Sequence, residues 1–195
     1  PPMPPTPCHE VWTPAPAPPT TPRIFPSVTV TPVGVVLFGG LGARGPLADG
    51  IVWDGARWRA LPRVGAPSPR FGHAAAWLGD ALCIWGGTGP QGVRGDGACW
   101  TPASDAWTPL PDEDAPSART SVGACAIDGA RWECGGVDVD DDAFGDNATW
   151  SPRTRRWHPL PAAASPHARR HPLVTPWPSG RGDVLVWGGA GDALA

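Results

Sequence analysis

A pair of adjacent glycines recurs four times along this 195-residue chain and sets its organisation. Successive pairs are separated by 47, 49 and 53 residues. Self-similarity at a fixed period of that size is typical of stacked supersecondary units that bury each other's faces. We therefore expect an array of similar units rather than one irregular domain. The pairs are Gly39-Gly40, Gly86-Gly87, Gly135-Gly136 and Gly188-Gly189.

Tryptophans and charged residues keep the same register as the glycine pairs. Each of the first three pairs is followed by a tryptophan that has an aspartate four residues before it. A second tryptophan follows, then Leu-Pro, and an arginine lies twelve residues beyond that tryptophan. Because so many features recur together, chance cannot explain them. The first tryptophans are Trp53, Trp100 and Trp150, the second are Trp58, Trp107 and Trp157, and the arginines are Arg70, Arg119 and Arg169.

This combination resembles the kelch repeat, which has an arginine-containing entry, a hydrophobic residue before Gly-Gly and two spaced aromatic residues. Phe38, Trp85, Cys134 and Trp187 precede the four glycine pairs. The resemblance covers nearly the whole chain and implies an all-β fold of about four kelch-type β-propeller blades, each a four-stranded antiparallel sheet. It also implies a relation to the galactose-oxidase-like superfamily. One departure is tryptophan at the first aromatic position, where the family more often has tyrosine.

The repeats divide the chain into five ranges. Trp12 begins a stretch that matches Trp107–Pro111, so we interpret Val11-Trp12 as the outer strand of an incomplete blade. Two architectures follow: an open arc cut from a larger propeller, or a small ring closed by pairing of the termini. The ranges are 1–22 for the proline-rich segment with that strand, 23–66, 67–115 and 116–165 for repeats 1 to 3, and 166–195 for a partial repeat 4 with inner strands only.

The composition excludes several chemistries. The chain has no tyrosine, so the tyrosyl radical of galactose-oxidase-like copper enzymes and a sialidase-type nucleophile are both impossible. It also has no lysine, so no side-chain amine can form a Schiff base. Only three glutamates are present, and a paired-carboxylate glycosidase would depend on aspartates. We therefore predict no cofactor and name no catalytic residue.

Net charge and hydrophobic patterning bear on partners and location. A net charge of −3 without a basic run argues against nucleic-acid binding. No apolar run approaches the roughly 20 residues that a membrane-spanning helix needs. Arginine without lysine, together with abundant Ala, Pro and Gly, suggests a GC-rich bacterial gene. We expect an exported protein, whether periplasmic, cell-surface or secreted, rather than a cytoplasmic one.

The loops after the glycine pairs and the blade entries should share one face, where propellers often bind ligands. Arg70, Arg119 and Arg169 could there form a ring that binds an anionic ligand by paired hydrogen bonds. The alternative, which we favour, is an architectural role, because each repeat carries the arginine. Asp49, Asp96 and Asp146 are predicted to be turn residues that cap backbone N–H groups.

The densest charge cluster is an acidic loop in repeat 3. Asp138, Asp140 and Asp142 alternate and form a weak calcium candidate, since calcium prefers oxygen ligands. Ala143 and Thr149 stand where an EF-hand loop needs glycine and glutamate, so that motif fails. A solvated acidic loop is the favoured interpretation, and no other metal site is predicted.

Five cysteines leave the redox state open. Cys125 and Cys134 flank a short turn and could face each other across a hairpin as a disulfide. The favoured interpretation is that all five are small buried hydrophobic residues on strands.

Three functions remain open from the sequence. The leading hypothesis is a non-enzymatic binding module whose loops bind a protein or carbohydrate on one face of the propeller. The second is part of a propeller enzyme that acts on carbohydrates and needs further blades. The third is a structural or adhesive repeat of an exported bacterial protein. The sequence does not name a ligand.

Overall fold

The protein is seen in a computed structural model that describes residues 14, 16–161, 165–179 and 181–191. Every regular element in these residues is a β-strand, which confirms the all-β prediction. In the same residues, no helix has the length and apolar character needed to traverse a bilayer. The predicted outer strand at Val11-Trp12 lies outside the described residues.

Three four-stranded antiparallel sheets follow one another along the chain, and we call them blades 1 to 3. Within each, the strands are hydrogen-bonded in chain order from an inner to an outer strand. Blade 1 contains β1 (Ser27–Thr31), β2 (Gly34–Phe38), β5 (Gly50–Trp53) and β6 (Trp58–Ala60). Blade 2 contains β7 (Ala74–Trp77), β8 (Leu82–Trp85), β11 (Gly97–Thr101) and β12 (Ala106–Pro109), and blade 3 contains β13 (Gly123–Ile127), β14 (Ala130–Cys134), β15 (Asn147–Ser151) and β16 (Arg156–Pro159).

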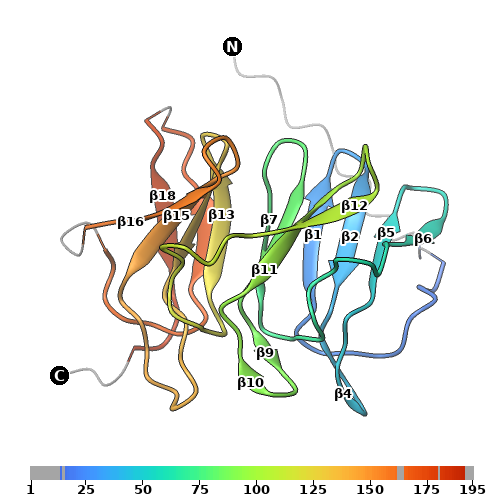
Figure 1. The fold of residues 1–195 in the computed structure, drawn as a ribbon, viewed down its shortest axis with the longest axis horizontal. Helices are drawn as coiled ribbons and strands as arrows, with labels where there is room; N and C mark the ends of the chain where they lie inside the picture. The colour runs from blue at the N-terminus through green and yellow to red at the C-terminus, as the bar shows by residue number, and fades with distance from the viewer. Residues whose placement is uncertain (1–13, 15, 162–164, 180, 192–195) are drawn as a thin grey trace.

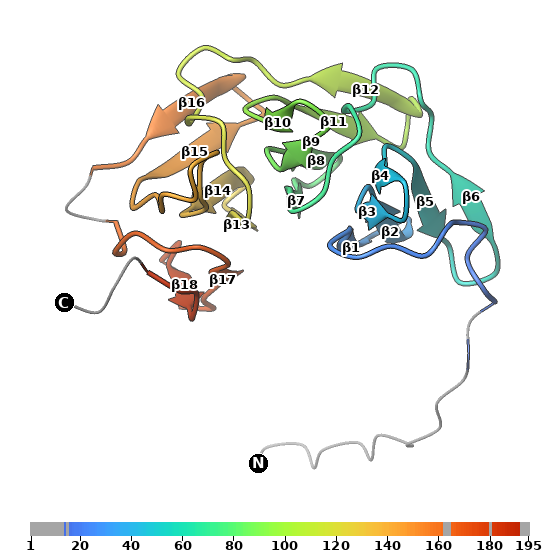
Figure 2. The same ribbon diagram turned by 90° about the horizontal axis from the view of Figure 1, so that it is seen from below.

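A fourth sheet contains two described strands, β17 (Leu173–Pro176) and β18 (Val184–Trp187), and we call it blade 4. Figure 2 shows the blades as an open arc, with β1, β7, β13 and β17 toward the centre and β6, β12 and β16 at the periphery. In the described part of the chain no sheet closes the arc. The structure therefore agrees with the open-arc alternative for these residues.

Two short hairpins project beyond blades 1 and 2. The strands β3 (Leu41–Gly42) and β4 (Gly45–Pro46) follow the first glycine pair, and β9 (Thr88–Gly89) and β10 (Gly92–Val93) follow the second. Figure 1 shows β4 and the β9–β10 hairpin at the same lower edge of the molecule. The second glycine pair illustrates why glycine is needed before such a loop: Gly87 has φ of +92°, and a Cβ there would lie 2.7 Å from the carbonyl oxygen of Phe71.

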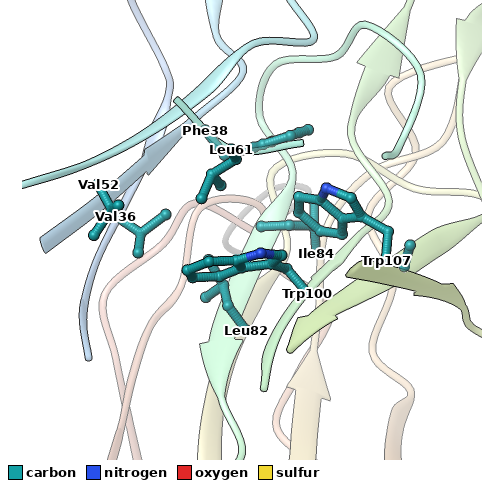
Figure 3. Packing of buried hydrophobic residues seen from close by; sticks show 9 residues of the cluster. Val36, Phe38, Val52, Leu61, Leu82, Ile84, Trp100 and Trp107 are labelled. Carbon is teal, nitrogen blue, oxygen red and sulfur yellow. The ribbon is translucent and has the colours of Figure 1, made fainter. Parts of the chain in front are cut away.

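Blades bury their flat faces against each other, which explains why the second strands of blades 1 and 2 are apolar without alternation. Between blades 1 and 2, Phe38 and Trp107 pack with ring centroids 5.4 Å apart. Figure 3 shows the side chains of both sheets converging in this core. The buried residues here are Val36, Phe38, Val52, Leu61, Leu82, Ile84, Ala98, Trp100 and Trp107.

A tryptophan on each outer strand ties its blade to the segment before it. The indole Nε1–H of Trp107 donates to the Pro62 carbonyl at 2.8 Å, and that of Trp157 donates to the Pro111 carbonyl at 3.0 Å. In blade 1, Trp58 donates in the same way to the Pro16 carbonyl at 2.8 Å. Pro16 thus occupies the place of Pro62 and Pro111.

The cysteine pairing differs from the one considered from the sequence. Cys83 and Cys99 form a disulfide between β8 and β11, where they are direct partners in the strand register. Cys125 and Cys134 are free and buried, because the β13–β14 register places Trp132 opposite Cys125 and Gly123 opposite Cys134. Burial raises the pKa of each of these two thiols to about 11.

Candidate functional site

The candidate site is the loop face, which we define as the blade entries and the loops that follow the glycine pairs. Each entry forms a single bridge to the residue after its own glycine pair, so the two segments lie on one edge in all four repeats. The bridges are Ile24 with Leu41, Phe71 with Thr88, Thr120 with Val137 and Arg170 with Ala190. These segments were predicted to gather on one face, and that face is this edge of the blades.

An arginine at each entry holds the base of the loop in its own repeat. In blade 1, Arg23 pairs both guanidinium nitrogens with the Asp49 carboxylate at 2.9 and 2.8 Å. Its Nη1 also donates to the Gly39 carbonyl at 2.9 Å. The hydrogen bond from Arg23 is the main reason why the pKa of Asp49 lies below its ordinary value. We call this arrangement the arginine latch.

Blade 2 has the same latch with a more buried guanidinium. Arg70 has no exposed surface, and its Nη1 donates to the Gly86 carbonyl at 3.0 Å, while its Nη2 reaches the Asp96 carboxylate at 3.0 Å. Burial lowers the pKa of Arg70, and the charge of Asp96 opposes this. Burial also raises the pKa of Asp96, but Arg94 and Arg70 outweigh it and the net shift is downward. Both groups remain charged at neutral pH.

Blade 3 repeats the latch and adds an aromatic contact. Arg119 is 2% exposed and donates to both carboxylate oxygens of Asp146, at 2.6 and 2.8 Å. Its guanidinium carbon lies 3.9 Å from the centroid of the Phe144 ring, within the range of a cation–π interaction. Burial raises the pKa of Asp146, but the hydrogen bond and charge of Arg119 leave it below its usual value.

Arg169 is the corresponding residue of blade 4. It donates to the carbonyls of Gly188 and His167, both at 3.0 Å, and is more exposed than its counterparts. These contacts show Arg70, Arg119 and Arg169 in one architectural position. The alternative that they bind an anionic ligand stays a prediction, and in blades 2 and 3 such a ligand would compete with the latch aspartates.

The latch extends our interpretation of the three aspartates. Asp49, Asp96 and Asp146 were predicted to cap backbone N–H groups of turns, and Asp49 and Asp146 do accept a backbone hydrogen bond. Each of the three also accepts hydrogen bonds from the arginine of its repeat, which was not predicted. The spacing from arginine to aspartate is almost constant, at 26, 26 and 27 residues. Two opposite charges recurring in one register are the sequence signal that would have identified this ion pair.

The acidic loop of blade 3 is organised by its own first residue. The Asp138 carboxylate accepts from the backbone N–H groups of Asp140 and Asp142, at 2.9 and 3.0 Å. Asp141 pairs with Arg170 from the next entry. Among the described residues, no three His, Cys, Asp or Glu side chains gather in a way that could hold a metal ion. The calcium interpretation of Asp138, Asp140 and Asp142 gains no support from this geometry.

A cavity of about 370 Å³ lies where the four entries converge. Its lining includes one residue in the same repeat position from each blade, and all four have left-handed backbone, with φ between 52° and 63°. Neighbouring members are joined by backbone hydrogen bonds of 2.9 to 3.3 Å. Strain of this kind is frequent at binding sites, and here three of the four residues carry side chains. The residues are Phe25, Gly72, Ser121 and His171.

His73 lies beside this cavity and is held in its neutral form. Its Nε2 is 2.9 Å from the Ser27 hydroxyl, and its ring packs edge-on against Phe38 at 5.6 Å. Burial is the main cause that lowers its pKa to about 3, and the charges of Arg70 and Arg131 add to the effect. The ring is therefore a structural link between blades 1 and 2 at neutral pH.

A second cavity on this face, of about 520 Å³, lies at the outer side of blade 1. It is lined by Pro19, Thr20 and Thr21 before the first blade and by Leu47, Asp49 and Arg63 of repeat 1. The loop face thus has two cavities in addition to the three loops that follow the first three glycine pairs.

Comparison with known proteins gives one partial match. The chain is 35% identical over 107 residues to Adagio-like protein 1 from Oryza sativa subsp. japonica. The match covers 50% of this chain and 17% of that protein, so the chain corresponds to a small part of this relative. No family model matches the chain. Because this relative is a plant protein, it gives no support to the bacterial origin inferred from composition.

Sequence reasoning missed a buried ion pair in blade 3. Arg131 and Glu133 are 0% and 2% exposed and hydrogen-bonded to each other, and Arg131 also donates to the Cys83 carbonyl at 2.7 Å. They occupy the positions of Leu82 and Ile84 in blade 2, relative to the glycine pair. Aligning the repeats would have shown two charges where the other blades have apolar residues.

Proposed function

We propose that this chain is a non-enzymatic, protein-interaction module made of kelch-type blades that presents the loop face to a partner protein. The observation that carries the proposal is the arginine latch. Buried guanidiniums fix the base of each loop to its blade, while the tips remain exposed at Arg44, Gln91 and Val139. A rigid scaffold with exposed variable loops is how many binding proteins present their contact residues.

Two further observations support the kelch assignment and the interaction role. The arginine, glycine-pair and tryptophan positions of the kelch pattern all have structural roles in these blades. The similarity to Adagio-like protein 1 places a related segment inside a longer plant protein. A module within a longer chain is the usual setting for an interaction domain.

The test is affinity capture from an extract of the source organism with the wild-type chain, followed by comparison with loop-tip variants. We expect R44A/Q91A/V139A to lose the captured partner while it keeps the melting temperature of the wild type. R57A is the matched control, because Arg57 is highly exposed but lies in the turn between β5 and β6, outside the loop face. Equal capture by the triple variant and the wild type would show that the loop face is not the binding surface.

We also propose that the protein resides in an oxidising compartment. The Cys83–Cys99 disulfide supports this, because disulfides persist mainly in exported proteins. Thiol counting by alkylation and mass spectrometry of the native protein tests it. Recovery of both cysteines as alkylated thiols without prior reduction would contradict the proposal.

A further inference from the structure

The edge opposite the loop face shows a difference between the two interfaces of blade 2. Between blades 1 and 2, the guanidinium carbon of Arg59 lies 5.6 Å from the centroid of the Trp100 ring. Asp105 completes the group: it accepts from the indole Nε1–H of Trp100 at 3.0 Å and from Arg59 at 3.1 Å. The indole N–H of Trp100 is thus satisfied within the chain, and its ring is covered.

Between blades 2 and 3 the equivalent positions hold different residues. Trp150 corresponds to Trp100, since each is the strand partner of the outer-strand tryptophan of its blade. Arg155 corresponds to Asp105, and both have left-handed backbone, with φ of 54° and 47°. Thr108 replaces Arg59. At the interface between blades 2 and 3, a cation therefore takes the place of the carboxylate acceptor. A short side chain takes the place of the long one that covers the indole.

This exchange leaves a donor without a partner beside a cavity. Trp150 is 6% exposed, and its Nε1–H has no hydrogen-bond acceptor among the described residues. A cavity of about 270 Å³ is lined by Trp150, Thr108 and Arg155, with the Cys83–Cys99 disulfide and Leu78 as an apolar part of its wall. An indole N–H can only donate, so the group that satisfies it must be an acceptor.

We propose that this cavity, which we call the 2–3 groove, binds the carboxylate of a single Asp or Glu side chain from a partner protein. The carboxylate takes the place that Asp105 takes beside Trp100. It accepts from the Nε1–H of Trp150 and pairs with the guanidinium of Arg155, while the methylene groups lie against Leu78 and the disulfide. This site lies on the edge opposite the loop face and goes beyond the proposed function.

Access to the indole requires a side chain to move. The Trp150 Nε1 atom is buried in the free chain, and Arg155 lines the same groove, so we take Arg155 to be the side chain that moves on binding. Its side chain is exposed, and its Nη2 contacts the Pro109 carbonyl at 3.5 Å, at the limit of a hydrogen bond. Movement of Arg155 therefore breaks only this weak hydrogen bond, and its guanidinium gains a charged partner.

Asp80 adds a negative charge to the groove. It lines the same groove, and its carboxylate disfavours a second negative charge beside it. The groove is therefore matched to one acidic side chain with an apolar stem rather than to an acidic run. A neutral amide lacks the charge that Arg155 would pair with, so we expect clear discrimination between Glu and Gln.

The test is titration of the full ¹⁵N-labelled chain, with the indole N–H resonance of Trp150 as the readout and W150F used to assign it. The probes are the peptides acetyl-Gly-Glu-Gly-amide and acetyl-Gly-Gln-Gly-amide. We expect the Glu peptide to move the Trp150 resonance downfield at concentrations at least tenfold lower than the Gln peptide. The Trp100 indole resonance, whose acceptor is Asp105, should not move and serves as an internal control.

Two variants complete the test. R155D should move the Trp150 resonance downfield without any probe, because it supplies the acceptor found beside Trp100, and it should abolish the response to the Glu peptide. R155Q, which keeps an uncharged polar side chain, should weaken the response at least tenfold. T108R/R155D copies the interface between blades 1 and 2 and should behave as R155D does.

Several outcomes would overturn the proposal. They are no shift of Trp150 in the wild type, equal responses to the two peptides, or an R155Q response equal to that of the wild type. A response to acetate at concentrations as low as those of the Glu peptide would also overturn it, because the groove would then be a site for free carboxylates rather than for a protein segment.

Discussion

The two interfaces of blade 2 come from the same repeat but differ in chemistry. Toward blade 1 the buried side chains are almost entirely apolar, and the indoles of Trp100 and Trp107 both have acceptors. Toward blade 3 the interface contains the Arg131–Glu133 pair and the Cys83–Cys99 disulfide. The repeat therefore fixes where strands lie, while the side chains at equivalent positions can change from apolar to charged.

Unsatisfied polar atoms concentrate on the second interface. Within the part of the chain that the structure describes, four atoms here are buried without a hydrogen-bond partner: Arg131 Nη2, Glu133 Oε2, and the Nε1 atoms of Trp85 and Trp150. Burial is also the main cause that raises the pKa of Glu133, against the opposing charge of Arg131. Such groups lower stability, so we infer that the interface between blades 2 and 3 is the weaker of the two.

The largest effect is expected from breaking the buried pair on one side. Arg131→Leu should lower the free energy of unfolding by about 3–5 kcal/mol, because it leaves the Glu133 carboxylate buried and unpaired. Urea unfolding at pH 7, followed by tryptophan fluorescence, measures this loss.

The matched variant is R131L/E133I, which copies Leu82 and Ile84 of blade 2. It should be as stable as the wild type or more stable by about 1–4 kcal/mol, because no buried charge remains. A double variant as unstable as R131L would show that the two interfaces do not differ in the way we infer.

A smaller loss is expected from removing the disulfide. C83S/C99S should lower the free energy of unfolding by roughly 3 kcal/mol, the value for a closed loop near the 16-residue separation of these cysteines. C83V/C99V should lose less, because Val36 and Val52 face each other at the equivalent positions of blade 1. Urea unfolding of both variants and of the wild type, with a dithiol reductant added to the wild type as a further comparison, checks the order; equal losses in the two variants would contradict it.

The pH dependence of stability tests a contact of the first interface. His73 has a pKa of about 3 in the folded chain and near 6.5 when unfolded, so below pH 6.5 the unfolded state binds the extra proton. Its contribution is therefore complete above pH 6.5 and is lost progressively as pH falls toward 3. At pH 5 the loss should be about 2 kcal/mol relative to pH 7.5.

His73→Gln removes this titration and keeps a partner for Ser27. Urea unfolding of both proteins between pH 7.5 and 4.5 gives the comparison. The latch aspartates have pKa values below their usual one and lose their contribution only at more acidic pH. Glu133, with its raised pKa, affects both proteins alike. Parallel pH profiles would contradict the assignment to His73.

The smallest effect concerns the acidic loop, where blade 3 lacks the hairpin of blades 1 and 2. We expect millimolar calcium to leave the melting temperature unchanged, because Asp138 uses its carboxylate on backbone N–H groups and Asp141 pairs with Arg170. Differential scanning calorimetry with calcium and with a chelator measures this. A calcium-dependent rise would instead support the site at Asp138, Asp140 and Asp142.

The sequence predicted the blades because their signals are local and repeated. In repeat 2, for example, Gly86-Gly87 marks the end of a strand and Trp107 marks the outer strand. The equivalent residues do the same in every full repeat. Contacts between repeats were harder to predict. The Cys83–Cys99 pairing depends on the register of two strands, and the Arg131–Glu133 pair depends on which face of β14 meets blade 2. The strand register is not visible in the spacing of residues along one chain, and the charged pair becomes visible only when the repeats are aligned with one another.

The loop face was predicted as a location, but its chemistry was only partly predicted. The arginines were recognised as a repeated feature, while their aspartate partners were assigned to turns. The cavity around Ser121 and His171 was not predicted, because it forms from four entries that are about fifty residues apart in sequence.

The arginine latch has a consequence for how such a chain can change. Because Arg23, Arg70 and Arg119 anchor each loop at its stem, mutations at the tips leave the blade hydrogen bonds intact. The loop tips can therefore be replaced one blade at a time, without redesign of the sheets beneath them. The chain is accordingly a starting framework for engineered binders in which recognition and folding are altered separately.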